Sequence, residues 1–308
     1  LINFFKKTIN YIKSKKMRMY KVLIVAFIMV GINAKCQNLS FEEYNPTSTL
    51  VVPQNLVKKA KFPFIDVHGH QYRMPTQDLS GVVAAMDTLN MGIMVNLSGR
   101  SGAQLAQSVK NIRDHYPDRF VVFANVDFGG VGNDDWAEKA TAQLEIDVKN
   151  GARGLKIYKS LGLRYKDTDG MRVAVDDKRL DPVWAKCGEL GIPVLIHSAD
   201  PKPFWDEFDK DNERWLELKT HSRRKRSDTD PAPWQQIMDE QTRMFQKHPN
   251  TNFISAHMAW SANDLGRLAS ILDETPNMHV GIGAIIAELG RQPRFAKAFI
   301  EKYQDRVL

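Results

Sequence analysis

The chain has 308 residues, with 43 Lys or Arg against 36 Asp or Glu, and its formal net charge is +7. Eight of the basic residues and none of the acidic ones lie in residues 1–36, so residues 37–308 carry a net charge of −1. The body of the protein therefore lacks the positive charge that would favour nucleic-acid binding, and its composition is that of an ordinary globular chain.

The N-terminal segment has the pattern of an export signal. The basic stretch Met17–Lys21 precedes the apolar run Val22–Ile32, and the small residue Ala34 follows. This order predicts a bacterial signal peptide over about residues 17–36, and the run is short for a permanent transmembrane helix. Residues 1–16 precede two candidate start methionines and are interpreted as an upstream segment. We therefore expect a periplasmic or secreted protein with no stable membrane span after cleavage.

Residues 37–61 are polar and predict an extended lead-in, whereas residues 62–308 alternate between strand-like and helical patterns. The predicted strands are Phe62–His70, Gly92–Ser98, Phe120–Asp127, Gly154–Lys159, Ile192–Ser198, Asn252–Met258 and Met278–Ala284. The predicted helices are Leu79–Asn90, Ala103–Tyr116, Trp136–Asn150, Pro182–Leu190, Trp234–Lys247, Asn263–Glu274 and Pro293–Tyr303.

Strands that are apolar on both faces, each followed by a helix, indicate a parallel sheet covered by helices. At this length the expected fold is α/β, a (β/α)8 barrel of the TIM type. An open doubly wound sheet is the alternative, but no glycine-rich phosphate turn follows any predicted strand. The eighth strand would start at Arg306, so the barrel of residues 62–308 is expected to be truncated there. The long connection 199–233 is expected to cover the site as a lid or pocket wall, or else to be a solvated insertion.

Four histidines lie at the ends of three predicted strands. His68 and His70 end the first strand, His197 ends the fifth and His257 ends the sixth. The carboxyl ends of barrel strands converge on one mouth, so these four side chains are expected to meet. Imidazoles two residues apart on a strand point the same way and can hold one divalent metal. An isolated histidine such as His197 would otherwise be interpreted as an ordinary core residue.

Together, Asp66-Val-His68-Gly-His70, Ile196-His197 and Ala256-His257 resemble the amidohydrolase superfamily. They are most similar to its amidohydrolase-related branch, which includes aminocarboxymuconate-semialdehyde decarboxylase. The resemblance covers about residues 62–308. It implies that His68, His70 and His197 are metal ligands. It also implies that His257 is catalytic, as an acid, base or polarising group, or a second ligand as in binuclear relatives. Imidazole ligands make zinc the expected metal.

The resemblance leaves two positions open. The metal-binding aspartate of the family would follow Leu308, beyond the given sequence. Lys156, on the predicted fourth strand, matches the lysine that binuclear relatives carbamylate to bridge two metals. It is equally well interpreted as a lysine that lines the pocket, so a mononuclear and a binuclear site both remain possible.

The expected function is a metal-dependent hydrolase that uses an activated water on an amide, ester or lactone bond. A divalent metal lowers the pKa of its bound water toward ~7, which supplies a nucleophile at physiological pH. A non-oxidative decarboxylase on the same site is the first alternative, and a non-catalytic binding barrel is the second. The expected partner is a small-molecule substrate rather than nucleic acid, and homo-oligomerisation is left open.

Overall fold

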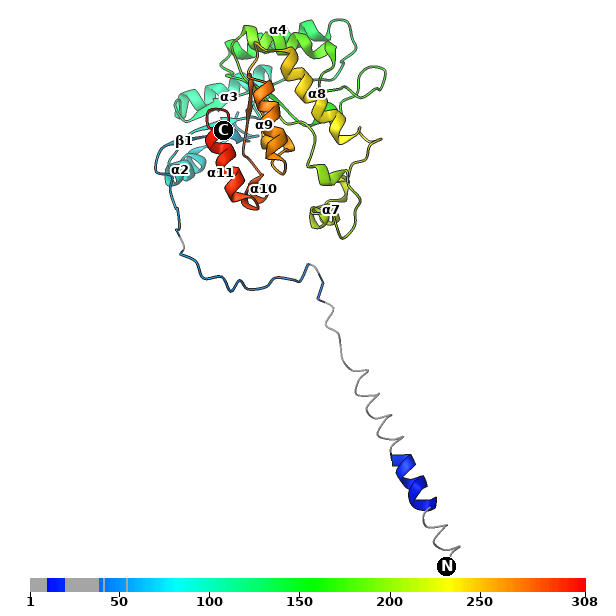
Figure 1. The fold of residues 1–308 in the computed structure, drawn as a ribbon. Helices are drawn as coiled ribbons and strands as arrows, with labels where there is room; N and C mark the ends of the chain where they lie inside the picture. The colour runs from blue at the N-terminus through cyan, green and yellow to red at the C-terminus, as the bar shows by residue number, and fades with distance from the viewer. Residues whose placement is uncertain (1–9, 20–38, 41, 54) are drawn as a thin grey trace, which may run out of the picture. The chain divides into compact units, whose positions relative to one another are not determined.

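The computed structural model describes residues 10–19, 39–40, 42–53 and 55–308 of the chain (Figure 1). The chain forms two compact units, Leu1–Gln54 and Asn55–Leu308. In the first unit, residues 10–19 are helical and exposed, whereas the apolar run of the predicted signal peptide, Val22–Ile32, lies outside the described residues. Within the described ranges, no helix has the length and apolar character needed to cross a membrane.

The second unit alternates strands and helices, as the sequence predicts. The strands are β1 Phe64–Gly69, β2 Met91–Asn96, β3 Phe120–Val122, β4 Ala124–Asn125, β5 Leu155–Ile157, β6 Val194–Ile196, β7 Phe253–Ser255 and β8 Met278–Val280. The longer helices are α2 Ser80–Leu89, α3 Gly102–His115, α4 Trp136–Lys149, α6 Asp181–Glu189, α8 Trp234–Lys247, α9 Leu265–Glu274 and α11 Pro293–Lys302. Shorter elements are α5 Ser160–Leu163, α7 Trp215–Thr220 and α10 Ile286–Gly290, with 3-10 turns η1 Lys178–Leu180, η2 Lys202–Phe204, η3 Ser222–Arg224 and η4 Ala256–Trp260.

All strand pairs are parallel and neighbours follow chain order, in the two runs β1-β2-β3 and β4-β5-β6-β7-β8. The prediction of a single third strand over Phe120–Asp127 was wrong, because this stretch forms two strands, β3 and β4, that are separated at Phe123. The Phe123 amide still donates to Asn96 at the end of β2 (3.0 Å), but the next amide, of Ala124, donates to Gly154 before β5 (2.8 Å). The backbone thus changes partner at Phe123 and joins the two runs.

The predicted eighth strand is confirmed at its start. Val307 forms a parallel bridge with Val280 of β8, and the Leu308 amide donates to the Val280 carbonyl at 2.8 Å. Among residues 55–308 no ladder joins β1 to this last segment. The fold is therefore a (β/α) barrel with the helices around the outside (Figure 1). In this part of the chain, its strands are not hydrogen-bonded to one another between β1 and the segment that contains Val307.

The inside of the barrel has its own small apolar cluster, separate from the layer between strands and helices. It contains Val95, Leu97, Phe123, Leu195, Ile254 and Ala256. Lys156 of β5 is in register with Leu195 of β6, which is in register with Ile254 of β7. Partners in register share a face of the sheet, so Lys156 points into the barrel, where its side chain is 1% exposed.

The long connection 199–233 contains η2, α7 and η3, and α7 lies apart from the other helices (Figure 1). The buried carboxylate of Asp200 holds the two ends of this connection in place. Asp200 pairs with Lys159 after β5 and with Arg226 at the other end of the connection (2.8 Å), while its carbonyl accepts from the Trp234 indole (2.9 Å). Both ends of the connection are thereby fixed at the carboxyl ends of the strands, and the role as a lid stays a prediction.

Candidate metal centre

The four strand-end histidines lie side by side at the carboxyl-terminal mouth of the barrel. The ring centroids of His68 and His70 are 5.5 Å apart, those of His68 and His257 are 5.1 Å apart, and those of His197 and His257 are 4.5 Å apart. The predicted convergence is thus observed. It follows from the parallel order of β1, β6 and β7, which places all three strand ends at the same edge.

His197 provides the clearest sign of a missing partner. Its Nε2 atom is buried and has no hydrogen-bond partner among the residues that the structure describes. An unpaired buried nitrogen is costly, so it is usually found where a ligand completes it. Burial, together with the charges of His257 and Lys156, holds the pKa of His197 well below its usual value. The ring is therefore neutral at physiological pH, which is the form that binds a metal.

The other three rings are also kept neutral. Burial, with help from Lys156, lowers the pKa of His68 to about 3. Burial likewise lowers the pKa of His70 and of His257, and the neighbouring Lys156 adds to both effects. Four neutral imidazoles at one mouth form a donor set suited to a divalent cation of borderline softness such as zinc.

A hydrogen-bond chain orients His70. The Tyr158 hydroxyl donates to the Leu97 carbonyl (3.1 Å), and Ser98 Oγ lies 2.9 Å from this hydroxyl and 2.8 Å from His70 Nδ1. The carbonyl can only accept, so the Tyr158 proton points to it, Ser98 donates to Tyr158, and His70 Nδ1–H donates to Ser98. This tautomer leaves the lone pair of His70 on Nε2, free for a metal.

His257 is held by an unusual backbone. His257, Met258, Ala259 and Trp260 all have left-handed backbones, with φ of 57°, 49°, 52° and 49°, a conformation that costs on the order of 1–3 kcal/mol per non-glycine residue. His257 Nδ1–H donates to the Gly283 carbonyl at 2.7 Å, which leaves Nε2 as the reactive nitrogen. Strain of this kind is maintained where a side chain has to be presented at a fixed angle.

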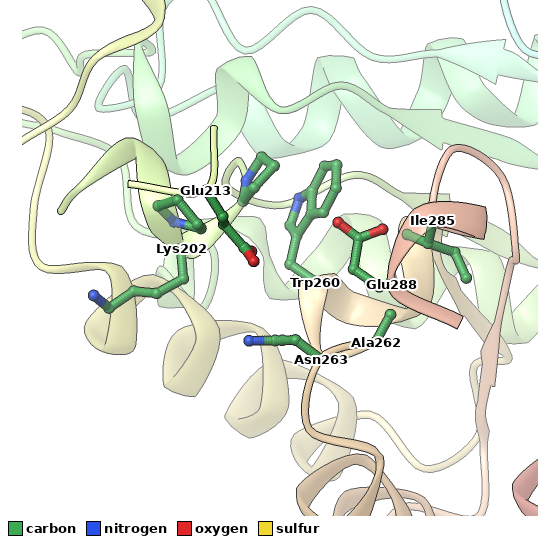
Figure 2. A pocket seen from close by; sticks show the side chains of 9 residues that line it. Lys202, Glu213, Trp260, Ala262, Asn263, Ile285 and Glu288 are labelled. Atoms are coloured by element: carbon green, nitrogen blue, oxygen red, sulfur yellow. The ribbon is translucent and has the colours of Figure 1, made fainter. Parts of the chain in front are cut away.

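Trp260 closes the site behind His257. Its indole stacks on the His257 ring with centroids 4.5 Å apart and forms one wall of a cavity of about 20 Å³, room for one water. Figure 2 shows the Glu288 carboxylate beside this indole. Trp260 Nε1 and Glu288 Oε2 are both buried without a hydrogen-bond partner among the described residues, which fits a water in this cavity.

Lys156 points into the barrel and acts electrostatically on all four histidines. Its Nζ atom is buried without a hydrogen-bond partner in the described part of the chain, and it lies 5.6 Å from the centroid of the Tyr158 ring. Burial lowers the pKa of Lys156 to about 7. A lysine whose pKa lies this far below its usual value is compatible with an amine that lines the pocket and with a carbamylated one.

A larger cleft opens beside His70, at the carboxyl ends of β1, β2, β4 and β5. Its volume is about 320 Å³, and it is lined by Tyr72, Ser98, Arg100, Ser101, Asn125, Val126, Asp127, Tyr158 and Tyr165. We refer to it as the tyrosine cleft. Ser98 and Tyr158 belong both to this cleft and to the hydrogen-bond chain of His70, so a molecule in the cleft would lie next to the histidines.

The structure also limits the metal hypothesis and the other candidates. No group of three or more His, Cys, Asp or Glu side chains in the described ranges is placed to hold a metal as it stands, so the rings have to turn toward a common point on binding. Asp66 turns back and accepts from the His68 amide (2.8 Å). His221, a histidine of the connection 199–233, is exposed, and its Nδ1 lies 2.9 Å from Thr220 Oγ1.

Sequence reasoning missed Ser98 and Tyr158, which orient His70, and Asp200, which fixes the connection 199–233. All three residues follow strand ends, and that position was the available signal for them. The Gly283 carbonyl, by contrast, is a backbone atom with no signature in the sequence.

A histidine-lined mouth on a (β/α) barrel defines the class of metal-dependent barrel enzymes. The chain belongs to the amidohydrolase family, because the family model described as Amidohydrolase matches residues 65–308. Members of this superfamily bind a divalent metal and act on small molecules. No curated protein matches the chain.

Several solved structures are similar to this chain at low identity. An uncharacterised TIM-barrel protein from Bordetella bronchiseptica has 18% identity and a TM-score of 0.49, with 75% of this chain and 68% of that chain covered. The 2,6-dihydroxybenzoate decarboxylase from Rhizobium has 16% identity and a TM-score of 0.47, with 81% and 86% covered. A dihydroxybenzoic acid decarboxylase from Polaromonas sp. JS666, with bound manganese and an inhibitor, has 16% identity and a TM-score of 0.48, with 75% and 74% covered.

Proposed function

We propose that the chain is a metal-dependent hydrolase in which His68, His70 and His197 hold one divalent metal, zinc being the expected one, and His257 moves the proton. The observation that carries the proposal is the buried, unpartnered Nε2 of His197 among neutral imidazoles. The substrate class would be a small amide, ester or lactone.

When bound, a divalent metal supplies a Lewis acid that polarises a carbonyl and acidifies water. The remaining work falls to the protein. His257 donates Nδ1–H to the Gly283 carbonyl, so its Nε2 can take a proton from a nucleophile and return it to a leaving group. Ser98 and Tyr158 hold His70 in one tautomer, and Trp260 covers the far side of His257 from water.

Hydrolysis should be tested on the zinc-loaded protein with a panel of small amides, esters and lactones. Product release that needs zinc and is lost in His68→Ala would support the proposal. Zinc-loaded protein without turnover on any hydrolysable substrate would favour the binding barrel instead.

Non-oxidative decarboxylation is the second candidate. It is favoured by Arg100, a cation that lines the tyrosine cleft and can hold a carboxylate next to the histidines. The two reactions differ in their products, since a decarboxylase releases carbon dioxide with no net consumption of water. Carbon dioxide release from a carboxylate substrate, with no hydrolysis of the panel, would select this candidate.

We further propose that the protein is exported to the periplasm or the medium, on the basis of the basic and apolar segments of residues 17–36. The N-terminal mass of the protein recovered from a bacterial host tests this. Cleavage near Ala34, with the protein outside the cytoplasm, would support export, and an uncleaved cytoplasmic protein would contradict it.

A further inference from the structure

A second cavity, of about 220 Å³, lies between the start of α3, the residues that follow β4 and one face of α4. Residues three or four apart share a face of a helix, and the face that lines this cavity consists of Trp136, Lys139, Ala140, Gln143, Leu144 and Asp147. We refer to it as the α4 cavity. The four histidines, Ser98 and Tyr158 are absent from its lining, so it is a different site from the proposed metal centre.

Asp147 is a buried carboxylate in this lining, with an exposed fraction of 1%. Its Oδ1 accepts from the Gly102 amide (2.7 Å) and from Gln143 Nε2 (3.0 Å), whereas its Oδ2 has no hydrogen-bond partner in the described ranges. No lysine, arginine or histidine of these ranges pairs with it. Because buried carboxylates are normally paired with a cation, Asp147 leaves a place for a positive charge that the described chain does not fill.

Capping of α3 accounts for only one of the two oxygens of Asp147. Ser101 precedes α3 without forming a side-chain cap, and Asp147 Oδ1 takes the Gly102 amide instead. The positive end of the helix dipole offsets part of the carboxylate charge, yet burial still raises the pKa of Asp147 above its usual value. The cap therefore does not explain why the cavity lies against this carboxylate.

The other charges of the lining do not neutralise Asp147. Lys139 is the one basic residue, and its Nζ pairs with Asp135 while its side chain is exposed. Asp127 is a second acid, whose Oδ1 accepts from the Gly129 amide (2.8 Å). With two acids against one lysine that is already paired, the cavity attracts a cation and repels an anion.

The remainder of the α4 face is apolar. Leu144 lies one turn before Asp147, and Ala140 lies a further turn along the same face. Trp136 forms the wall at the first turn of α4, and its Nε1 is occupied because it donates to the Asp127 carbonyl (3.1 Å). A chain of methylene groups can cover this surface, since no polar group of these three side chains needs a partner.

We propose that the α4 cavity binds a small aliphatic ammonium ion, with the ammonium group at Asp147 and the alkyl chain along Leu144 and Trp136. An ammonium has three N–H donors, of which one meets Asp147 Oδ2. Gln143 Oε1, next to this carboxylate, accepts no hydrogen bond in the described part of the chain and can take a second. A neutral alcohol of the same size would leave the buried charge uncompensated. The proposal needs neither the metal nor His257, so it is independent of the proposed function.

The test is calorimetric titration of n-butylammonium, with butan-1-ol and butyrate for comparison, into wild-type, Asp147→Asn and Asp118→Asn proteins. Asp147→Asn keeps an oxygen for the Gly102 amide and removes the charge, and Asp118 is an exposed aspartate outside the cavity that serves as the control. We expect Asp147→Asn to weaken n-butylammonium about tenfold or more, the range for a hydrogen bond to a charged group. Asp118→Asn should bind it like wild type, and wild type should bind the alcohol and butyrate more weakly.

Ala140→Leu tests the position of the ligand without changing any charge. Leucine is a good helix former, and its larger side chain would fill the cavity from the α4 face. This variant should lose n-butylammonium binding while it still melts cooperatively, and it decides the question if Asp147→Asn does not fold. Titration of chelator-treated wild-type protein should give the same affinity as untreated protein.

Three results would overturn the proposal. One is n-butylammonium that binds equally well to wild type, Asp147→Asn and Ala140→Leu. Another is wild-type protein that does not bind n-butylammonium, or that binds butyrate more tightly. The third is binding that disappears with the metal, because the amine would then lie at the metal centre. Loss of turnover after metal removal, with n-butylammonium binding unchanged, would support both this site and the proposed function.

Discussion

The Nδ1 atom of His257 lies 2.7 Å from the carbonyl oxygen of Gly283, which joins the end of β7 to the loop after β8. Because a carbonyl only accepts, this contact places the proton of His257 on Nδ1 and its lone pair on Nε2. The left-handed turn that follows fixes the ring at this angle. A histidine prepared in this way can transfer protons without being needed as a ligand.

We therefore expect His257→Asn to retain its metal while kcat falls ~10²-fold or more, the size typical of lost acid–base catalysis. Elemental analysis checks that the metal is retained, and kcat on the best substrate checks that catalysis is lost. Loss of metal together with activity would instead make His257 a ligand, as in a binuclear site.

Lys156 gives a prediction for pH dependence. Its pKa is lowered to about 7 in the fold by burial, whereas the unfolded lysine has the usual value of 10.5. Between these two values the unfolded chain binds the extra proton, so stability rises with pH over this window and is lost as pH falls toward 7. The melting temperature of metal-free wild-type protein should rise from pH 7 to pH 10 by about 2 °C or more.

Lys156→Met is the matching variant, because it keeps the unbranched chain as far as Cε and removes only the buried amine. It should melt higher than wild type at pH 7 and should flatten this part of the pH profile. Metal content should stay unchanged if Lys156 only lines the pocket, whereas a fall would indicate that it bridges two metals. If the melting temperature of Lys156→Met rose with pH as steeply as that of wild type, a group other than Lys156 would cause the pH dependence.

Gly99 lies where the chain after β2 passes close to Phe123. A Cβ built at Gly99 would lie 2.2 Å from the Phe123 carbonyl oxygen, so the backbone must shift to accept one. We expect Gly99→Ala to destabilise the protein by roughly 1–3 kcal/mol, as overpacking usually does. Denaturant unfolding measures this effect.

Gly81→Ala is the control for Gly99→Ala, because nothing lies within 4 Å of a Cβ built at Gly81 in α2. This helical substitution should be neutral or stabilise by about 0.4–1 kcal/mol. If Gly99→Ala and Gly81→Ala had the same free energy of unfolding, the close approach of the Phe123 carbonyl would not restrict the residue at position 99.

The sequence was sufficient to predict the order of strands and helices and the meeting of the four histidines. Both follow from local patterns, since apolar runs alternate with helical ones and parallel strands end at one edge. It could not reveal the chain from Tyr158 through Ser98 to His70, whose members are 60 and 28 residues apart. It also could not reveal the division of the third strand at Phe123, which depends on the partner that each amide finds.

Local propensity was also misleading at His257. Four consecutive left-handed residues without glycine run against every local preference. Contacts from elsewhere, such as the Met258 amide donating to the Gly281 carbonyl (2.9 Å), maintain the turn.

The central claim is that His68, His70 and His197 bind the metal, and its most direct test is metal content after extensive dialysis. Wild-type protein should retain about one equivalent of a divalent metal, as a single three-histidine site would, and His197→Ala and the less buried His68→Ala should lose it while still melting cooperatively. His115→Ala, which removes an exposed histidine from α3, should retain the wild-type content. Unchanged metal in folded His197→Ala and His68→Ala proteins would contradict the assignment.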